Sequence, residues 1–196
     1  MISQAAKDSF ERIFFQAART RLTTEPTHAC DIVPIVVRRH NDDEVGGNPE
    51  HGHGYEHGPS AEVHVLTIAS IGFRVVLLLQ FADDEATHAY YASQGQATDR
   101  TLREAAMEIG NLCCGAVNQQ LVEHFPHLGM STPYTLSSEC MSYLSELKPN
   151  HVAAYDITVE YAARLRATLC VCAREPLDFA AQVAQVHESA GELELF

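Results

Sequence analysis

The stretch Glu104-Ala-Ala-Met-Glu108-Ile-Gly-Asn111-Leu-Cys-Cys-Gly115 lies in a long helix that we predict over residues 99–125. Because successive residues of a helix are rotated by about 100°, one side of this helix is polar and the other is apolar. The polar stripe consists of Glu104, Glu108, Asn111, Gly115 and Asn118. The apolar side is expected to pack on a hydrophobic core. It consists of Leu102, Ala105, Ile109, Leu112, Cys113 and Ala116.

The polar stripe combines carboxylates and amides with a glycine, and it contains no lysine or arginine. A helix face that is only solvated more often mixes lysine and arginine with glutamate. Gly115 presents bare backbone, which allows another molecule to come close. The stripe is therefore a candidate contact surface, with plain solvation as the alternative interpretation. Glu104 also has a structural alternative, because Thr101-x-x-Glu104 has the pattern of a capping box.

Outside this helix, the sequence predicts an α+β fold, in which an antiparallel sheet is packed with two long helices. The other long helix is expected over residues 3–21, where Phe10, Ile13, Phe14 and Ala17 are spaced as one buried side. Strands are expected at 32–38, 62–70, 73–81, 155–161 and 165–171. Pro34 indicates that the first strand either lies at an edge of the sheet or contains a bulge. Shorter helices are expected at 84–94 and 177–187.

The 196 residues fit a single domain, which we expect to span positions 1–196. Residues 41–60 are rich in glycine, asparagine, histidine and acidic side chains, and are expected to form a mobile loop. Residues 188–196 are expected to form a weakly ordered tail. The six irregularly spaced cysteines are typical of reduced, mostly buried thiols, and Cys170 and Cys172 are expected to share one face of a strand.

Charge and hydropathy limit the partners of the chain. The formal net charge of −13 repels phosphate backbones and anionic lipids, so neither nucleic acid nor a membrane surface is an expected partner. No apolar run is long enough to span a membrane. The first residues also lack the basic and then apolar pattern of a signal peptide. We therefore expect a cytoplasmic protein that docks to a protein surface presenting lysine or arginine.

The pattern Glu108-x-x-Asn111, with Gly115 four residues further on, resembles the signature of the CheC/CheX/FliY phosphatases of bacterial chemotaxis. Pro133, in Gly129-Met-Ser-Thr-Pro133, corresponds to a proline of that signature, although it stands one residue short of the usual spacing. Glu104 is a second departure, because it stands where the family has Asp or Ser. The resemblance covers residues 61–179 and is greatest to CheX. The first helix carries no second Glu-x-x-Asn, so one site per chain is implied.

The resemblance implies a CheX/CheC-like fold, a homodimer and a role in two-component signalling. The implied activity is hydrolysis of the aspartyl phosphate on a CheY-like response-regulator receiver domain, which carries its own Mg²⁺. This chain itself then needs no cofactor. In this hypothesis Asn111 positions the attacking water and Glu108 pairs with a lysine of the receiver. Glu104, Gly115 and Asn118 contact the same partner. The alternative is a non-catalytic CheX-like module that binds receivers or flagellar-switch components.

A third hypothesis is a metal-responsive sensor built on His51, His53 and His57 in the loop at 41–60. Imidazole and nearby carboxylates are suitable ligands for Zn²⁺ or Ni²⁺. Their spacing matches no closed structural site, and the intervening glycines leave such ligands flexible. We therefore expect a solvated loop and no metal site.

Overall fold

In the residues that the structure describes (1–36, 61–92 and 100–182), the computed structural model contains a seven-stranded sheet. All neighbouring strands pair antiparallel, in the order β1-β6-β7-β3-β2-β4, and β5 also pairs with β2. The strands are β1 (Cys30–Ile35), β2 (Glu62–Ala69), β3 (Phe73–Phe81), β4 (Gly129–Met130), β5 (Tyr134–Ser137), β6 (His151–Val159) and β7 (Ala163–Ala173). The predicted loop at 41–60 and tail at 188–196 lie outside the described residues.

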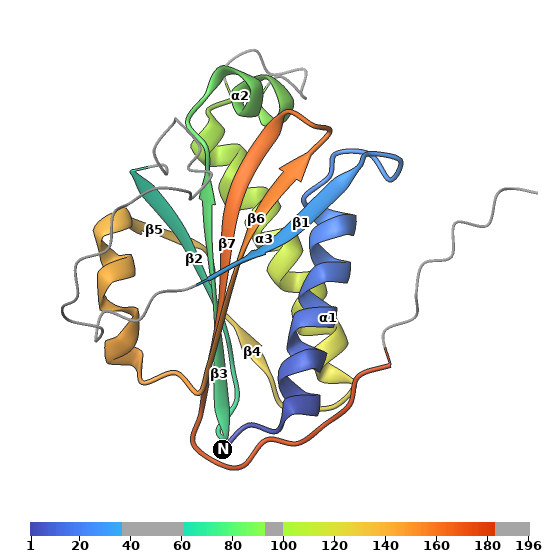
Figure 1. Cartoon of the computed structure of the whole chain (residues 1–196), viewed down its shortest axis with the longest axis vertical. Coiled ribbons are helices and arrows are strands. Elements are labelled where there is room, and N and C mark those ends of the chain that lie inside the picture. Colours follow the sequence, from blue (N-terminus) through green and yellow to red (C-terminus); the bar gives the residue numbers. More distant parts are fainter. Residues whose placement is uncertain (37–60, 93–99, 183–196) are drawn as a thin grey trace, which may run out of the picture.

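Two long helices, α1 (Gln4–Arg21) and α3 (Leu102–Val122), lie side by side on one face of the sheet (Figure 1). Ser3 begins α1, because its hydroxyl accepts a hydrogen bond from the amide of Ala6 at 3.1 Å. Phe10, Ile13 and Phe14 are fully buried between α1 and the sheet. The expected α+β architecture with two long helices is thereby confirmed. A short helix, α2 (Glu85–Tyr91), covers one end of this layer.

The opposite face of the sheet is covered in part by a 3₁₀ helix, η1 (Ser138–Leu147), which we did not predict. The side chains of Cys140, Met141, Leu144 and Leu147 pack over a second, smaller core. That core contains Val63, Val65, Val76, Leu78 and Cys170. Strand β3 is consequently buried on both faces along most of its length. The site helix α3 therefore rests on a sheet that is supported from behind.

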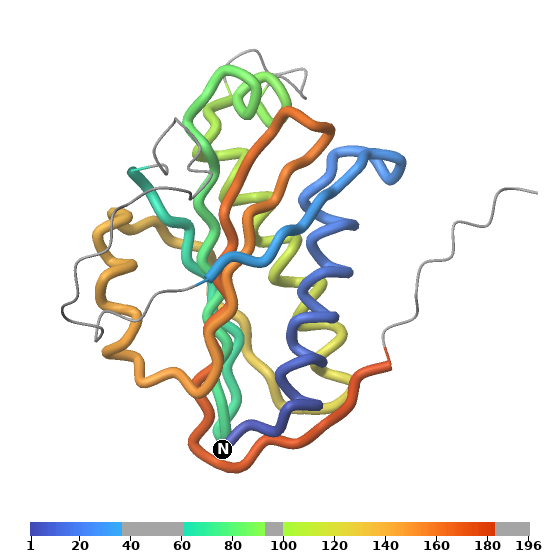
Figure 2. Tube along the Cα trace, in the orientation of Figure 1, coloured from blue at the N-terminus to red at the C-terminus, as the bar shows by residue number. Residues whose placement is uncertain are grey.

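The strand pairs agree closely with the prediction, while the helix predicted at 177–187 is wrong over its described part, residues 177–182. Strands β2 and β3 form the expected hairpin through residues 70–72, and Pro34 lies in an edge strand that pairs only with β6 among the described strands. The segment at 177–182 is not helical: Leu177 forms a parallel bridge with Ile2 instead. The path of this segment along the start of α1 can be followed in Figure 2. Tertiary pairing with the N-terminus has thus replaced the helix that the apolar spacing suggested.

Candidate functional site

The capping box predicted from Thr101-x-x-Glu104 is present at the start of α3. The hydroxyl of Thr101 accepts from the backbone amide of Glu104 at 3.2 Å. The Oε2 atom of Glu104 in turn accepts from both the backbone amide and the hydroxyl of Thr101, each at 2.9 Å. The hydrogen bond from the Thr101 amide, followed by that from its hydroxyl, lowers the pKa of the exposed Glu104 carboxyl. The structural interpretation of Glu104 is confirmed, and its contact with a receiver stays a prediction.

The polar stripe lies on the side of α3 that faces solvent. Glu104 and Glu108 are exposed, while Asn111, Gly115 and Asn118 are half-buried. The buried side consists of Ala105, Ala106, Gly110, Cys113, Cys114, Val117 and Leu121. The structure therefore keeps a carboxylate and an amide one helical turn apart, at Glu108 and Asn111, with both reachable from solvent.

Leu112 was predicted to face the core, and this prediction is wrong, because 47% of the residue is exposed. The helix is rotated so that small residues meet the sheet: a Cβ atom placed on Gly110 would lie 3.3 Å from Leu79 Cδ1 and 3.4 Å from Leu66 Cδ1. This close approach turns Leu112 toward solvent beside Glu108. The candidate surface thus includes an apolar side chain that sequence reasoning had assigned to the core.

Gly115 differs from Gly110 in having open space around it. A Cβ atom at position 115 would meet no atom within 4 Å, apart from the helix's own neighbouring backbone and chain neighbours. Nothing in the packing of the described residues therefore requires a glycine at this position. Its value would lie in the bare backbone that it offers to an approaching molecule.

Part of the Asn118 side chain is buried. Its Oδ1 atom is buried and has no hydrogen-bond partner among the described residues. A buried acceptor without a donor is unfavourable in the free protein. The proposed contact of Asn118 with a receiver stays a prediction.

Glu108 has an intramolecular partner that the sequence analysis missed. The Nη2 atom of Arg100 donates to Oε2 of Glu108 at 2.5 Å. Arg100 comes directly before Thr101, the N-cap of α3, and is eight residues from Glu108 in sequence. The available signal was a long cationic side chain just ahead of the helix, which can reach along its first two turns.

Pro133 lies between β4 and β5, in a segment attached to the edge of β2. Ser131 fixes this segment, since its amide donates to the carbonyl of Thr67 at 2.8 Å and its hydroxyl accepts from the amide of Thr67 at 3.0 Å. Helix α3 contacts both β2 and β4. The proline of the family signature is thus tied to the same edge of the sheet that supports the site helix.

The thiols near the site are buried and unsuited to nucleophilic chemistry. Burial raises the pKa of Cys113 far above its usual range and that of Cys114 to about 12. On β7, Cys170 and Cys172 share one face of the sheet as predicted, since they pair with Val76 and Arg74. Within the described ranges, no cluster of histidine, cysteine or acidic residues can hold a metal ion. His51, His53 and His57 lie outside those ranges.

None of the helices in the described part of the chain has the length and apolar character needed to cross a membrane. No family model matches the sequence, and no curated protein matches it. Solved structures of chemotaxis proteins are similar in fold, and two of them illustrate this. The chemotaxis protein CheX from Vibrio vulnificus is 13% identical, with a TM-score of 0.51, and the match covers 83% of this chain and 99% of that one.

The second structure is that of a protein from Desulfovibrio vulgaris Hildenborough that is described as a chemotaxis protein. It is also 13% identical, with a TM-score of 0.53, and the match covers 83% of this chain and 96% of that one. At this level of identity the likeness concerns the fold. The resemblance found in the sequence is therefore confirmed for the architecture: this chain has the fold of the chemotaxis protein CheX.

Proposed function

We propose that this protein is a phosphatase that accelerates hydrolysis of the aspartyl phosphate on a CheY-like receiver domain. The observation that supports this proposal is the pairing of Glu108 with Asn111 on the solvent side of α3, beside the open backbone of Gly115. The Glu108-x-x-Asn111 pattern resembles part of the signature of the CheC/CheX/FliY phosphatases, and it lies on a long helix of a chain whose fold is that of CheX. The net charge of −13 favours a partner with exposed lysine or arginine, and Glu104 and Glu108 place two carboxylates on this surface.

Asn111 is the proposed catalytic residue that positions water. Its side-chain carbonyl accepts a hydrogen bond from the attacking water, and its uncharged amide does not repel the anionic phosphoryl group. The water oxygen forms a bond to phosphorus while the bond from phosphorus to the aspartyl oxygen breaks, which releases phosphate and restores the aspartate. The receiver supplies Mg²⁺, which neutralises charge on the phosphoryl oxygens. This chain contributes positioning and no cofactor.

Glu108 is proposed to orient the two domains rather than to act as a base. Its carboxylate would pair with a lysine in the active site of the receiver, and such a pair fixes the register of an interface. Gly115 would let the receiver backbone approach α3 closely, and the side-chain amide of Asn118 would contact the receiver at the edge of the interface. Glu104, whose Oε2 atom is bonded to Thr101, adds negative charge next to this surface.

Kinetics that separate kcat from KM test these assignments. With a phosphorylated receiver and Mg²⁺, we expect Asn111→Ala to lower kcat by about 100-fold or more and to leave KM near the wild-type value. We expect Glu108→Gln chiefly to raise KM. Equal loss of kcat and binding in both variants would refute the division of roles. Wild-type protein that binds the receiver without accelerating hydrolysis would favour the non-catalytic module.

We also propose that the protein acts in the cytoplasm as a homodimer, as the family resemblance implies. Strand β1 supports a dimer, because it lies at the edge of the sheet and pairs only with β6 among the described strands. Such an edge presents unpaired backbone groups that a second strand can bind. Analytical ultracentrifugation tests this state directly, and a monomer at micromolar concentration would contradict it.

A further inference from the structure

In the free protein, the carboxylate proposed to bind the receiver is already occupied. Arg100 Nη2 donates to Glu108 Oε2 at 2.5 Å, so an internal guanidinium stands where the lysine of a receiver is expected. The neighbouring carboxylate, that of Glu104, has a different partner. Glu104 is committed to Thr101 through two hydrogen bonds of 2.9 Å.

Two cations cannot share one carboxylate without cost. A lysine ammonium that reached Glu108 while Arg100 remained there would be repelled by the guanidinium, and its attraction to the carboxylate would be partly cancelled. The existing pair is able to open, because the Arg100 side chain is 26% exposed and that of Glu108 is 63% exposed. Ion pairs at this level of exposure contribute little to stability and break without unfolding.

We propose that Arg100 is an internal competitor of the receiver's lysine for Glu108, and that docking exchanges one cation for the other. The inference rests on the proposed function and specifies how its affinity is set. Arg100 holds Glu108 in the free protein, limits its attraction for lysine-bearing surfaces in general, and is released only by a partner whose lysine arrives in register. Its role is therefore in partner binding and not in the chemical step.

Arg103 provides a matched control in the first turn of the same helix. It carries the same charge and is three residues further along the chain, but its guanidinium lies 3.5 Å from Glu62 of β2. Replacing either arginine by alanine changes the net charge equally. A difference between the two variants therefore reports the contact with Glu108 and not the general field of the protein.

The test measures receiver dephosphorylation at low ionic strength for wild type, Arg100→Ala, Arg100→Lys and Arg103→Ala. We expect Arg100→Ala to lower KM about 2- to 5-fold, as befits an exposed ion pair, with kcat unchanged. Arg100→Lys should largely restore the wild-type KM, Arg103→Ala should leave it unaltered, and added salt should shrink the difference. In a Glu108→Gln background, Arg100→Ala should no longer change KM.

An unchanged or raised KM in Arg100→Ala would overturn the competition. A fall in kcat would overturn it too, because Arg100 would then act on the phosphoryl group itself. If Arg100→Ala and Arg103→Ala lowered KM equally, the change would come from net charge alone, and the proposal would likewise be refuted. If the wild-type protein neither binds nor dephosphorylates the receiver, the proposed function has failed, whereas normal wild-type activity with a silent Arg100→Ala removes this inference alone.

Discussion

At the scale of single residues, the first two turns of α3 hold one structural carboxylate and one that we propose to be functional. Glu104 closes the capping box with Thr101, while Glu108, one turn further, faces solvent and Arg100. Both roles of Glu104 were visible in the sequence, since Thr101-x-x-Glu104 and the family pattern overlap at this residue. Only the geometry places its Oε2 atom on Thr101. The sequence showed a cationic side chain just ahead of the helix, but only the path of the chain before the helix brings Arg100 to Glu108.

We predict that Thr101→Ala lowers the free energy of unfolding by about 1 kcal/mol, since it removes the N-cap hydroxyl, and leaves kcat unchanged.

Glu104→Gln keeps a capping side chain and should leave kcat unchanged. The folded pKa of Glu104 is lowered, so its stabilising effect is present above the ordinary value of 4.5 and is lost as pH falls through the folded value. Urea unfolding at neutral and acidic pH should show that Glu104→Gln has lost this dependence. A raised KM for the receiver in Glu104→Gln would support the predicted contact of Glu104 with the receiver, whereas a fall in kcat would contradict its assignment outside the chemical step.

At the scale of elements, α3 is set on the sheet by small buried residues. Ala106 and Gly110 allow the helix to lie close to β2 and β3, and this fixes the rotation that exposes Leu112. Small residues contribute little to a hydrophobic pattern, so the sequence predicted the existence of the amphipathic helix but misjudged its rotation. The 3₁₀ helix η1 had a usable signal, because Cys140, Met141, Leu144 and Leu147 are spaced as one side of a helix.

The two glycines of α3 yield opposite predictions. Gly115→Ala should raise the free energy of unfolding by about 0.5–1 kcal/mol, because alanine is the better helix former and its Cβ meets nothing. The same variant should raise KM for the receiver, because it fills the open backbone of the proposed site. Gly110→Ala should gain less stability or lose some, since its Cβ would press on Leu66 and Leu79. Thermal unfolding and receiver kinetics of both variants check this, and an unchanged KM in Gly115→Ala would refute the contact.

Two leucines of the same helix test its rotation. Leu121 is fully buried, so Leu121→Ala should cost about 2–5 kcal/mol. Leu112 is half exposed, so Leu112→Ala should cost less than about 1 kcal/mol. Denaturant titration measures both values. Comparable losses in the two variants would mean that Leu112 is a core residue, as its place in the sequence pattern first suggested.

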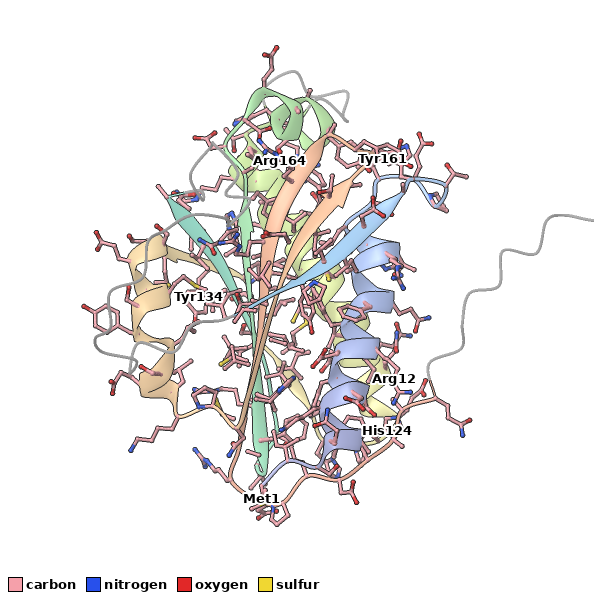
Figure 3. The ribbon with its side chains drawn as sticks, in the orientation of Figure 1. Met1, Arg12, His124, Tyr134, Tyr161 and Arg164 are labelled. Carbon is pink, nitrogen blue, oxygen red and sulfur yellow. The ribbon has the colours of Figure 1, made fainter. Side chains whose placement is uncertain are left out.

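At the scale of the whole molecule, the two ends of the described chain contact each other at one end of the helix layer. Leu177 bridges Ile2, and the ring of Phe179 lies 5.0 Å from those of both Phe10 and Phe125. Figure 3 shows Arg12 and His124 at this end of the layer, where α1 and α3 come together. The antiparallel strand pairs and both long helices were predictable from local periodicity. This closure was not, because it depends on residues that lie far apart in the sequence.

Ser9 provides the test of this closure. Its hydroxyl is buried, donates to the carbonyl of Ala5 at 2.6 Å and accepts from the amide of Ala181 at 3.0 Å. Ser9→Ala should cost about 1–3 kcal/mol, because the amide of Ala181 loses this buried acceptor. Thr20 of α1 makes the same kind of bond to the carbonyl of Gln16 at 2.9 Å but is exposed, so Thr20→Ala should change stability by less than about 0.5 kcal/mol. Equal effects in the two variants, measured by calorimetry, would contradict a structural role for the C-terminal segment.

The central claim is that Asn111 of α3 promotes hydrolysis of a receiver's aspartyl phosphate. The most direct test follows the decay of a phosphorylated CheY-like receiver with Mg²⁺, alone, with wild-type protein and with Asn111→Ala, alongside a measurement of binding. We predict that wild-type protein accelerates the decay and that Asn111→Ala binds equally well but does not. Undiminished acceleration by Asn111→Ala, or binding by the wild type with no acceleration, would contradict the claim.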